Sequence, residues 1–500
     1  MARAARFLFP LLWVACGIVA LADCAPTGQR STALAVPQIR SSAGVASVRL
    51  DAVLTADGTP AFSYAGRVGV APTIRVVPGD RIIVVLHNDM RAQRNHGNDV
   101  NLHFHGLSVS PQAPGDDVLT TLAHPGQTLR YDVRVPADHP PGLYWYHPHV
   151  HGQTFWQVAH GMSGAIVVEG LQRRIPALEH MRERIVILRQ RPTGPGITEA
   201  SDAPGSAEAV EDAAGNPCRP EVAMRPTIDG QPRERFEIGR GEEQFFRVLN
   251  ASASRYFDLS IDGVALHLVA IDGVPLEAYP GARAILTLDH VKIAPGGRAE
   301  FVVQGPAASA VLRSRCVDSG PSGDAQPAAI LGELAVEPGA AVGPALAPAE
   351  AATPARNAPS KHLPPPARRR FIRLTEDAKQ FYINGKTFDM RAMGGPAAVV
   401  ARAGTVEEWD ISNDTDEGHD FHIHQVHFVQ EAVNGIPIAD RHWADTVDVP
   451  SRTHYWNHTT PGTVRLLVDF RDPIVRGRFV FHCHILDHED RGMMATLEVR

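Results

Sequence analysis

The chain has 500 residues, more than one hydrophobic core usually holds, and this length suggests about three domains. Hydrophobic residues make up 44% of the chain and charged residues 21%, a composition that excludes a disordered or fibrous protein. The formal net charge of -7 argues against nucleic acid as a partner.

The first 22 residues predict an export signal. Arg3 and Arg6 give a basic start, residues 7–22 are apolar, and Ala20-Leu21-Ala22 fits a small-x-small cleavage site. An apolar run of roughly 16 residues is too short for a stable membrane span. Because the segment lacks an Arg-Arg pair, general secretion is favoured over the twin-arginine route. We expect a periplasmic or extracellular protein, with lipid anchoring at Cys24 as a lesser alternative.

The cysteines fit an oxidising compartment. Of the five, Cys16 and Cys24 belong to the signal region or its margin. Cys218 and Cys316 can then pair as a disulfide, which leaves Cys483 as a free thiol. Spacing does not show that two cysteines approach each other, so the disulfide is a hypothesis.

A short pattern recurs three times: a glycine turn, an alternating apolar strand, and an asparagine nine residues after the glycine. The copies occupy residues 79–88, 241–250 and 404–413, and their near-equal spacing indicates internal repetition. Short β-branched and aromatic runs with Pro-Gly turns surround them, and long helical periodicity is hard to find. The sequence therefore predicts an all-β protein of three sandwich-like domains.

Composition suggests the domain boundaries. Residues 23–43 are polar and predict a flexible tail. Residues 338–370 are rich in Ala and Pro and predict a linker, whose final Arg368-Arg369-Arg370 run is interpreted as a solvated linker end. The predicted domains are residues 44–170, 171–337 and 371–500.

Histidines cluster in the first and third predicted domains. The clusters are His103 with His105, His147 with His149, His419 with His422 and His424, and His482-Cys483-His484 with His488. Side chains at i and i+2 of a strand share a face, so such pairs can bind adjacent metals. Cys483 would face away from both of its histidine neighbours, so one strand can contact two metal centres. The second domain is interpreted as a spacer without ligands, and the metals are expected between domains one and three.

The last cluster also defines a particular metal chemistry. A thiolate, two imidazoles and a more distant thioether form a soft donor set, which suits an electron-transfer copper site. Cys483 supplies the thiolate, and Met493 or the adjacent Met494 can supply the thioether.

These four segments, in this order, resemble the three-domain multicopper oxidases of the laccase and bacterial copper-efflux-oxidase type, over nearly all of the mature chain. The resemblance implies three cupredoxin-like Greek-key β-sandwich domains and four copper ions. It implies an enzyme that takes single electrons from a small-molecule or metal-ion reductant and reduces O2 to two waters. The implied ligands are His419, Cys483, His488 and axial Met493 for type 1 copper; His103 and His422 for type 2; and His105, His147, His149, His424, His482 and His484 for the type 3 pair. By the same pattern, His151 and His427 are not ligands.

Three acidic residues are candidates for further roles. Reducing O2 consumes protons, so a buried acid near the cluster would serve as a donor. Glu489 sits where the copper-efflux type places such an acid, and Asp116 is a second candidate, although Asp117 makes the register ambiguous. Solvated loop acids are the alternative for both. Asp445 is interpreted as a substrate contact bordering the type 1 site, with a turn acid as the alternative.

The substrate is the least defined feature. Laccase-type enzymes take phenols and aromatic amines, whereas metallo-oxidases take Cu(I), Fe(II) or Mn(II). The chain has only nine Met and no Met-rich cluster between its motifs, which departs from the copper-efflux type. A phenol-type reductant is therefore expected, with metal-ion oxidation as the alternative and a non-catalytic exported scaffold as a remote one. The oligomeric state is left open, with a monomer favoured.

Overall fold

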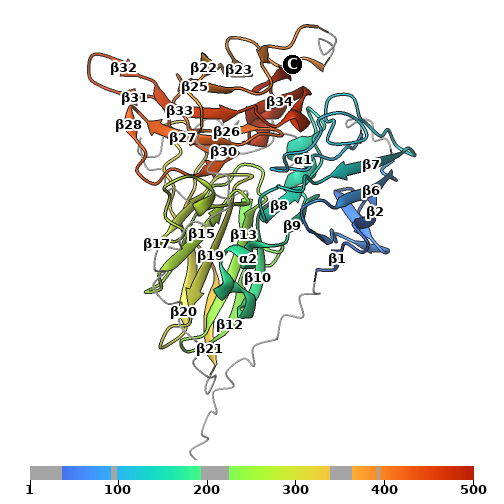
Figure 1. The fold of residues 1–500 in the computed structure, drawn as a ribbon, viewed down its shortest axis with the longest axis vertical. Coiled ribbons are helices and arrows are strands. Elements are labelled where there is room, and N and C mark those ends of the chain that lie inside the picture. The colour runs from blue at the N-terminus through green and yellow to red at the C-terminus, as the bar shows by residue number, and fades with distance from the viewer. Residues whose placement is uncertain (1–35, 92–97, 193–223, 338–362, 391–394) are drawn as a thin grey trace, which may run out of the picture. The chain divides into compact units, whose positions relative to one another are not determined.

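The computed structural model describes residues 36–91, 98–192, 224–337, 363–390 and 395–500. Strands dominate these ranges (Figure 1), and the all-β class predicted from the sequence is confirmed. The helices are short: α1 (Thr154–Ala159), α2 (Leu171–Arg174), α3 (Leu486–Asp490) and the 3-10 turns η1 (Pro176–His180), η4 (Leu276–Ala278) and η6 (Pro473–Val475). Within the described ranges, no helix has the length and apolar character that a membrane crossing requires.

The first sandwich contains a five-stranded and a four-stranded sheet. The five-stranded sheet has the order β4 (Arg67–Val68), β3 (Pro60–Tyr64), β2 (Val45–Leu54), β6 (Arg81–Asn88) and β7 (Thr128–Arg134); the four-stranded sheet has the order β1 (Gln38–Arg40), β5 (Thr73–Val76), β9 (Gly164–Val168) and β8 (Gly142–Tyr146). Buried and half-exposed residues alternate strictly along β6, as expected of a strand with one face on the core. That core includes Leu86, Phe104, Tyr131 and Ile166.

The second sandwich contains a seven-stranded and a five-stranded sheet. The larger has the order β11 (Met224–Ile228), β10 (Arg182–Pro192), β13 (Glu243–Asn250), β19 (Arg298–Gln304), β15 (Leu266–Ile271) and β16 (Val274–Pro275), with β17 (Leu286–Leu288) also paired to β15; the smaller has the order β12 (Glu234–Gly239), β21 (Ala329–Glu337), β20 (Ala310–Arg315), β14 (Phe257–Ile261) and β18 (Val291–Ile293). Every residue of β13 is buried, so this strand lies between the sandwich core on one face and other packed side chains on the other.

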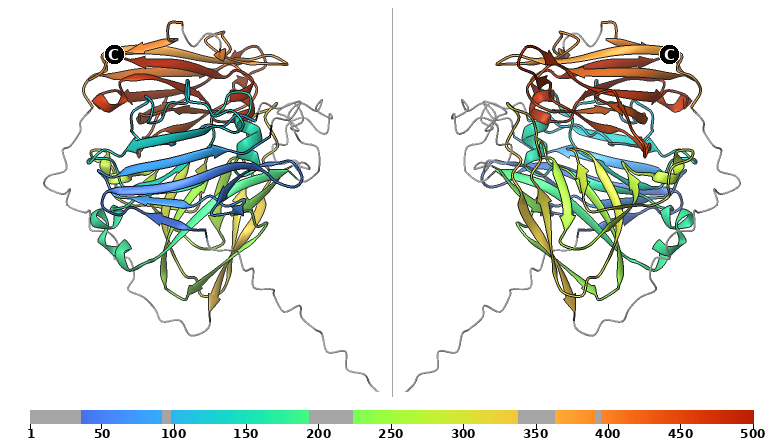
Figure 2. Two further views of the ribbon diagram at one scale, coloured as in Figure 1. Left: turned by 90° about the vertical axis from the view of Figure 1, so that its right-hand side faces the viewer. Right: turned by 90° about the vertical axis from the view of Figure 1, so that its left-hand side faces the viewer.

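The third sandwich repeats this arrangement. Its larger sheet has the order β23 (Phe381–Ile383), β22 (Arg368–Glu376), β25 (Val406–Asn413), β33 (Gly462–Asp469), β27 (Phe428–Val433) and β28 (Ile436–Pro437), with β29 (Trp443–Ala444) also on β27; its smaller sheet has the order β24 (Val399–Ala401), β35 (Met494–Val499), β34 (Gly477–Cys483), β26 (His419–Ile423) and β30 (Thr446–Val449); and β31 (Thr453–His454) pairs with β32 (Thr459–Thr460). Figure 2 shows from two sides how the strands of each sandwich run side by side in their sheets.

The repeated Gly-to-Asn pattern has a structural reason. Each copy ends on a fully buried asparagine at the end of an equivalent strand: Asn88 in β6, Asn250 in β13 and Asn413 in β25. Each side-chain amide donates to at least two backbone carbonyls, and each side-chain oxygen accepts from the backbone N–H two residues on. An asparagine can therefore tie two neighbouring segments to the strand end, which no apolar side chain can do.

Two boundary predictions need correction. β1, at residues 38–40, lies in the predicted flexible tail, yet it pairs in parallel with β5. Arg368–Arg370 begin β22 and pair with β25, so the arginine run is not a linker end. Arg370 forms an ion pair with Glu407 across these two strands, which explains why charged residues suit a strand there. The third sandwich thus begins before residue 371.

The disulfide hypothesis is tested at one of its two residues. Cys316 is disulfide-bonded, and Cys483 is a free, buried thiol, as the ligand role requires. Cys218, the expected partner, lies outside the described residues, as do the predicted export signal and most of the Ala- and Pro-rich linker.

Candidate metal centres

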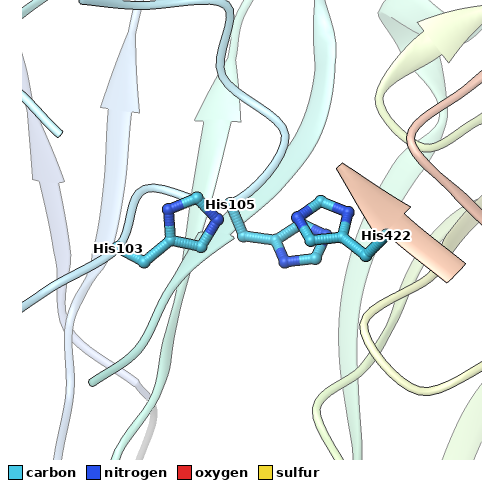
Figure 3. Close-up of side chains that lie close together, drawn as sticks. All are labelled: His103, His105 and His422. Carbon is cyan, nitrogen blue, oxygen red and sulfur yellow. The ribbon is translucent and has the colours of Figure 1, made fainter. Parts of the chain in front are cut away.

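Ten buried histidines and Cys483 come together in groups of three. In each group the candidate ligand atoms lie within 4.8 Å of one another; four of these groups are His103/His105/His422, His105/His147/His484, His149/His424/His482 and His419/Cys483/His488. Figure 3 shows the first group, in which His422 from the third sandwich lies beside His103 and His105 from the first. All eleven residues predicted as histidine or cysteine ligands belong to these groups.

Strand pairing explains why the groups form. β26 and β34 are antiparallel neighbours, and their register sets His422 directly opposite His482. In the first sandwich, His103 and His147 form a bridge, with reciprocal backbone hydrogen bonds of 2.8 and 3.1 Å. Rings then stack across the two sandwiches: His105 lies on His422 with 3.9 Å between ring centroids. The i, i+2 spacing in the sequence therefore becomes two facing sets of imidazoles.

Buried imidazole nitrogens without partners among the described residues show that this histidine cluster suits metal ions. His103, His147 and His422 each use Nδ1 for a hydrogen bond, at 2.8–2.9 Å, to Asp116, Pro148 and Asp445 respectively. Their Nε2 atoms are buried without a hydrogen-bond partner among the described residues. One nitrogen is thus fixed from outside and the other is left free, as metal-ligating histidines require.

A second group presents nitrogens to one another. The Nε2 atom of His482 lies 3.2 Å from Nε2 of both His149 and His424. Burial lowers the pKa of His482 to about 4 and that of His149 well below its usual value, so these rings are neutral. Three converging neutral donors in a buried space suit a cation, and imidazole is a good ligand for copper.

The Cys483 group lies on the side of β34 opposite His482. The Cys483 sulfur is 3.7 Å from Nδ1 of both His419 and His488, and these two nitrogens are 3.1 Å apart. The backbone N–H of Asp420 points to the sulfur at 3.4 Å, which favours a thiolate ligand. Phe381 stacks on His488 with 4.0 Å between ring centroids.

Met493 and Met494 pack in different hydrophobic clusters. Met493 is fully buried in the hydrophobic cluster that also contains Cys483, and its backbone N–H donates to the His488 carbonyl at 2.8 Å. Met494 packs in a different cluster with Val118 and Val480. Met493 therefore packs in the same cluster as Cys483, whereas Met494 does not.

Both predicted proton-donor acids lie close to histidines that are predicted ligands. Asp116 lies 2.9 Å from His103 Nδ1, and Gln425 donates to the same carboxylate oxygen at 2.6 Å. Glu489 accepts a hydrogen bond from the Thr154 hydroxyl at 3.0 Å, and its second oxygen lies 3.4 Å from His482 Nδ1. Burial raises the pKa of Asp116 to about 8, and burial followed by repulsion from Asp490 raises that of Glu489 well above its usual value. Solvated loop acids are excluded, because both side chains are buried.

Asp445 lies elsewhere than predicted. Instead of bordering the Cys483 group, it is fully buried beside the histidine cluster. Its Oδ1 atom is 3.3 Å from His105 Nε2, and its backbone carbonyl accepts a hydrogen bond from His422 Nδ1 at 2.8 Å. Burial raises the pKa of Asp445, but the stronger combined effect of the Arg298 charge and its hydrogen bonds lowers it. The substrate-contact interpretation of Asp445 is therefore wrong.

The second sandwich is more than a spacer. Its Arg298 forms a buried ion pair with Asp445, with N–O distances of 2.8 and 2.6 Å. Its Gly296, in a left-handed conformation, has so little room that a Cβ atom would lie 2.8 Å from His484 Nε2 and 3.0 Å from His105 Cε1. Sequence reasoning missed both residues, because neither belongs to a histidine motif.

Two further histidines stay outside the groups described above. His151 makes an edge contact with the Phe388 ring, and His427 lies 3.7 Å from the Asp445 carboxylate. The sequence interpretation of both as non-ligands thus agrees with their contacts, which are with an aromatic ring and a buried acid.

A small hollow lies beside His488. Its lining includes Tyr256, Asp324, Gln326 and Glu417. A Glu417 oxygen lies 3.3 Å from His488 Nε2. The buried Tyr256 hydroxyl and Gln326 side-chain oxygen have no hydrogen-bond partner within the described part of the chain. The hollow therefore presents several oxygen atoms next to His488 of the Cys483 group.

Comparison with known proteins supports the interpretation of these centres. Family models described as multicopper oxidase match residues 53–173, 199–311 and 362–500. A multicopper oxidase of Staphylococcus aureus is 23% identical over 86% of this chain and 82% of its own length.

Solved structures share the fold. A multicopper oxidase from Campylobacter jejuni, described as a metallo-oxidase, superposes with a TM-score of 0.70 at 22% identity, covering 93% of this chain and 94% of that one. A laccase-like multicopper oxidase from Ochrobactrum sp. gives 0.69 at 21% identity, covering 93% and 99%. The predicted cupredoxin-like β-sandwich class is confirmed. The chain belongs to the multicopper oxidase family, whose members are oxidoreductases that use four copper ions.

Proposed function

We propose that this enzyme removes single electrons from a reductant beside His488 and reduces O2 to two waters at the histidine cluster between the first and third sandwiches. One observation carries the proposal. The chain itself joins the two centres, because Cys483 belongs to one group and its neighbours His482 and His484 belong to the other. When bound, copper supplies the one-electron redox chemistry and the site of O2 reduction.

The groups of three support the ligand assignment. Type 1 copper would be held by His419, Cys483, His488 and Met493, and type 2 copper would be held by His103 and His422. The six remaining histidines form two groups, one for each type 3 copper: His105, His147 and His484, and His149, His424 and His482. Each type 3 group takes residues from both outer sandwiches, so the cluster is complete only when these sandwiches are joined.

Two buried acids are proposed to supply protons. Glu489 lies behind His149 and His482, at 3.6 and 3.4 Å from their Nδ1 atoms. Asp116 lies behind His103. In these positions the Glu489 and Asp116 carboxyl groups can each hold a proton next to the cluster without direct access to bulk solvent.

Two classes of reductant are proposed, and they differ in what must lie beside His488. The first is a phenol or aromatic amine, for which the laccase-like structural relative is a precedent. The second is a metal ion, for which the Campylobacter relative is a precedent and which the hollow next to His488 favours. Its donors are oxygen atoms of Glu417, Asp324 and Gln326, which suit hard ions such as Mn(II) or Fe(II) better than Cu(I).

The two classes can be separated with the copper-loaded enzyme. O2 uptake is measured with a methoxyphenol, Fe(II), Mn(II) and Cu(I), for the wild type and for Glu417→Gln. Metal-ion oxidation predicts that Glu417→Gln raises KM for Fe(II) or Mn(II) by tenfold or more and changes the phenol KM little. Phenol oxidation with no turnover of any metal ion would contradict the metal-ion proposal. Absence of O2 uptake with all four donors would contradict the oxidase itself.

We also propose that the protein is exported. The predicted signal at residues 1–22 supports this proposal, and so does the disulfide at Cys316, because disulfides persist mainly in oxidising compartments. Mass spectrometry of the secreted or periplasmic fraction tests it. A mature N-terminus near residue 23 is expected, whereas an intact N-terminus in the cytosol would contradict export.

A further inference from the structure

Arg298, the first residue of β19, joins all three sandwiches at one point. Its guanidinium has five N–H donors, and all five are used. Nε donates to the Leu143 carbonyl at 3.2 Å, Nη1 donates to the Gly296 carbonyl at 3.1 Å, and Nη2 donates to the Asp272 carbonyl at 2.8 Å. The other two N–H groups form a fork on the Asp445 carboxylate, at 2.8 and 2.6 Å. Such a bidentate pair fixes direction as well as distance.

Asp445, held in this way, in turn orients two predicted copper ligands. Its carboxylate faces His105 Nε2 at 3.3 Å, and the opposite ring nitrogen, Nδ1, is buried without a partner among the described residues. Its backbone carbonyl accepts from His422 Nδ1 at 2.8 Å, and His422 Nε2 is likewise left free. Two ligands assigned to different coppers are therefore oriented by one residue. A carboxylate acceptor also increases the basicity of the imidazole that it contacts.

The surroundings leave this pair little freedom to move. Asp272 accepts from the backbone N–H groups of Arg298 and Asp445, at 2.9 and 3.2 Å. The Thr446 hydroxyl donates to the Asp445 carboxylate at 2.8 Å. Gly106 follows His105 at a φ of 83°, and a Cβ atom there would lie 2.3 Å from Arg298 Nη2 and 2.7 Å from Asp445 Oδ2. Only glycine fits at that position, so the glycine that ends the His-x-His-Gly sequence leaves the space that the ion pair occupies.

We propose that Arg298 and Asp445 are positioning residues of the trinuclear copper cluster: Asp445 orients His105 and His422, and Arg298 holds Asp445 while it joins the second sandwich to the other two. The inference rests on the proposed copper function. Through Arg298, the second sandwich, which supplies none of the assigned ligands, would influence the geometry of the oxygen-reducing site.

The proposal is tested with Asp445→Asn, Arg298→Lys and a matched control. In Asp445→Asn, an amide N–H₂ faces an arginine N–H, so the fork is lost with little change in shape. In Arg298→Lys the charge remains, but three donors replace five. Arg247→Lys is the control, because Arg247 is also buried in the second sandwich and forms ion pairs with Glu183 and Glu300. It therefore reports the cost of altering a buried arginine away from the assigned ligands.

The measurements are copper content during titration with a chelator, the type 2 electron paramagnetic resonance signal, and the blue absorption of type 1 copper. We expect both site variants to keep the blue absorption but to lose the other three coppers at about 10- to 100-fold lower chelator concentration, with an altered type 2 signal. Arg247→Lys is expected to match the wild type, whatever its melting temperature.

Two results would overturn the proposal. One is a wild-type chelator profile and type 2 signal in both site variants. The other is a loss of copper in Arg247→Lys equal to that in Arg298→Lys. If Asp445→Asn does not fold, Arg298→Lys decides the matter by the same readouts. Wild-type protein that binds type 1 copper alone would instead contradict the proposed function, so the two failures are distinguishable.

Discussion

Replacing Gly296 with alanine tests whether the second sandwich packs against the oxygen-reducing site. Gly296 has a φ of 80°, and placing an L-residue in such a left-handed conformation costs roughly 1–2 kcal/mol. The added Cβ atom would also lie 2.8 Å from His484 Nε2 and 3.0 Å from His105 Cε1, where ordinary contacts are 3.4–4 Å. Overpacking of this kind costs roughly 1–3 kcal/mol more. The overpacking cost falls on His484 and His105, which belong to one group of predicted copper ligands.

Gly281→Ala is the matched control. Gly281 is in the same sandwich at a φ of 83°, and a Cβ atom there would meet nothing within 4 Å. Only the backbone cost applies to it. The difference of about 1–3 kcal/mol corresponds to about 5- to 150-fold weaker copper retention in Gly296→Ala. Copper content is measured by chelator competition at one protein concentration. Equal copper loss in the two variants would refute the predicted contact.

Three further predictions concern the centres themselves. Met493→Leu should raise the type 1 reduction potential, because the thioether that stabilises the oxidised ion is lost, whereas Met494→Leu should not; redox titration of both variants decides this. Glu489→Gln should lower turnover by about 10- to 100-fold and flatten its pH profile, since a proton donor contributes about 100-fold or more. Reduction of the type 1 copper, followed by stopped flow, should stay unchanged. An unchanged turnover and pH profile would exclude a donor role. Removal of copper by a chelator should lower the melting temperature and abolish O2 uptake, and Cu(II) should restore both, because a ligand that binds only the folded state stabilises it; an apoprotein that melts at the holoprotein temperature would be inconsistent with four bound ions.

The histidine ligands could be predicted from sequence because strand geometry is local. His-x-His spacing predicts pairs of neighbouring imidazoles, and the resemblance to the family supplies the full ligand set. In the structure His422 and His482 lie on β26 and β34, whereas His103 and His147 form an isolated bridge outside the strands. The preference for Met493 over Met494 comes from the resemblance to the family, and the two residues pack in different clusters, Met493 with Cys483 and Met494 with Val118 and Val480.

Other parts of the site depend on contacts between distant segments. Arg298 lies 147 residues from Asp445 in the sequence, and no local pattern marks either as a partner of the other. Sequence reasoning places Asp445 beside the type 1 site for this reason, whereas its ion pair with Arg298 of β19 shows a buried acid beside the histidine cluster. The arginine run at the start of β22 was misjudged similarly, because its carboxylate partners lie on β25.

The buried cluster of eight histidines and the separate Cys483 group are proposed to act together as one four-electron oxidase. The most direct test is an O2 titration of fully reduced, copper-loaded protein, with simultaneous measurement of hydrogen peroxide. We predict four bound coppers per chain, one O2 consumed for every four electrons, and no peroxide. Peroxide as the main product with two electrons per O2, or reoxidation of type 1 copper alone, would contradict the proposed mechanism.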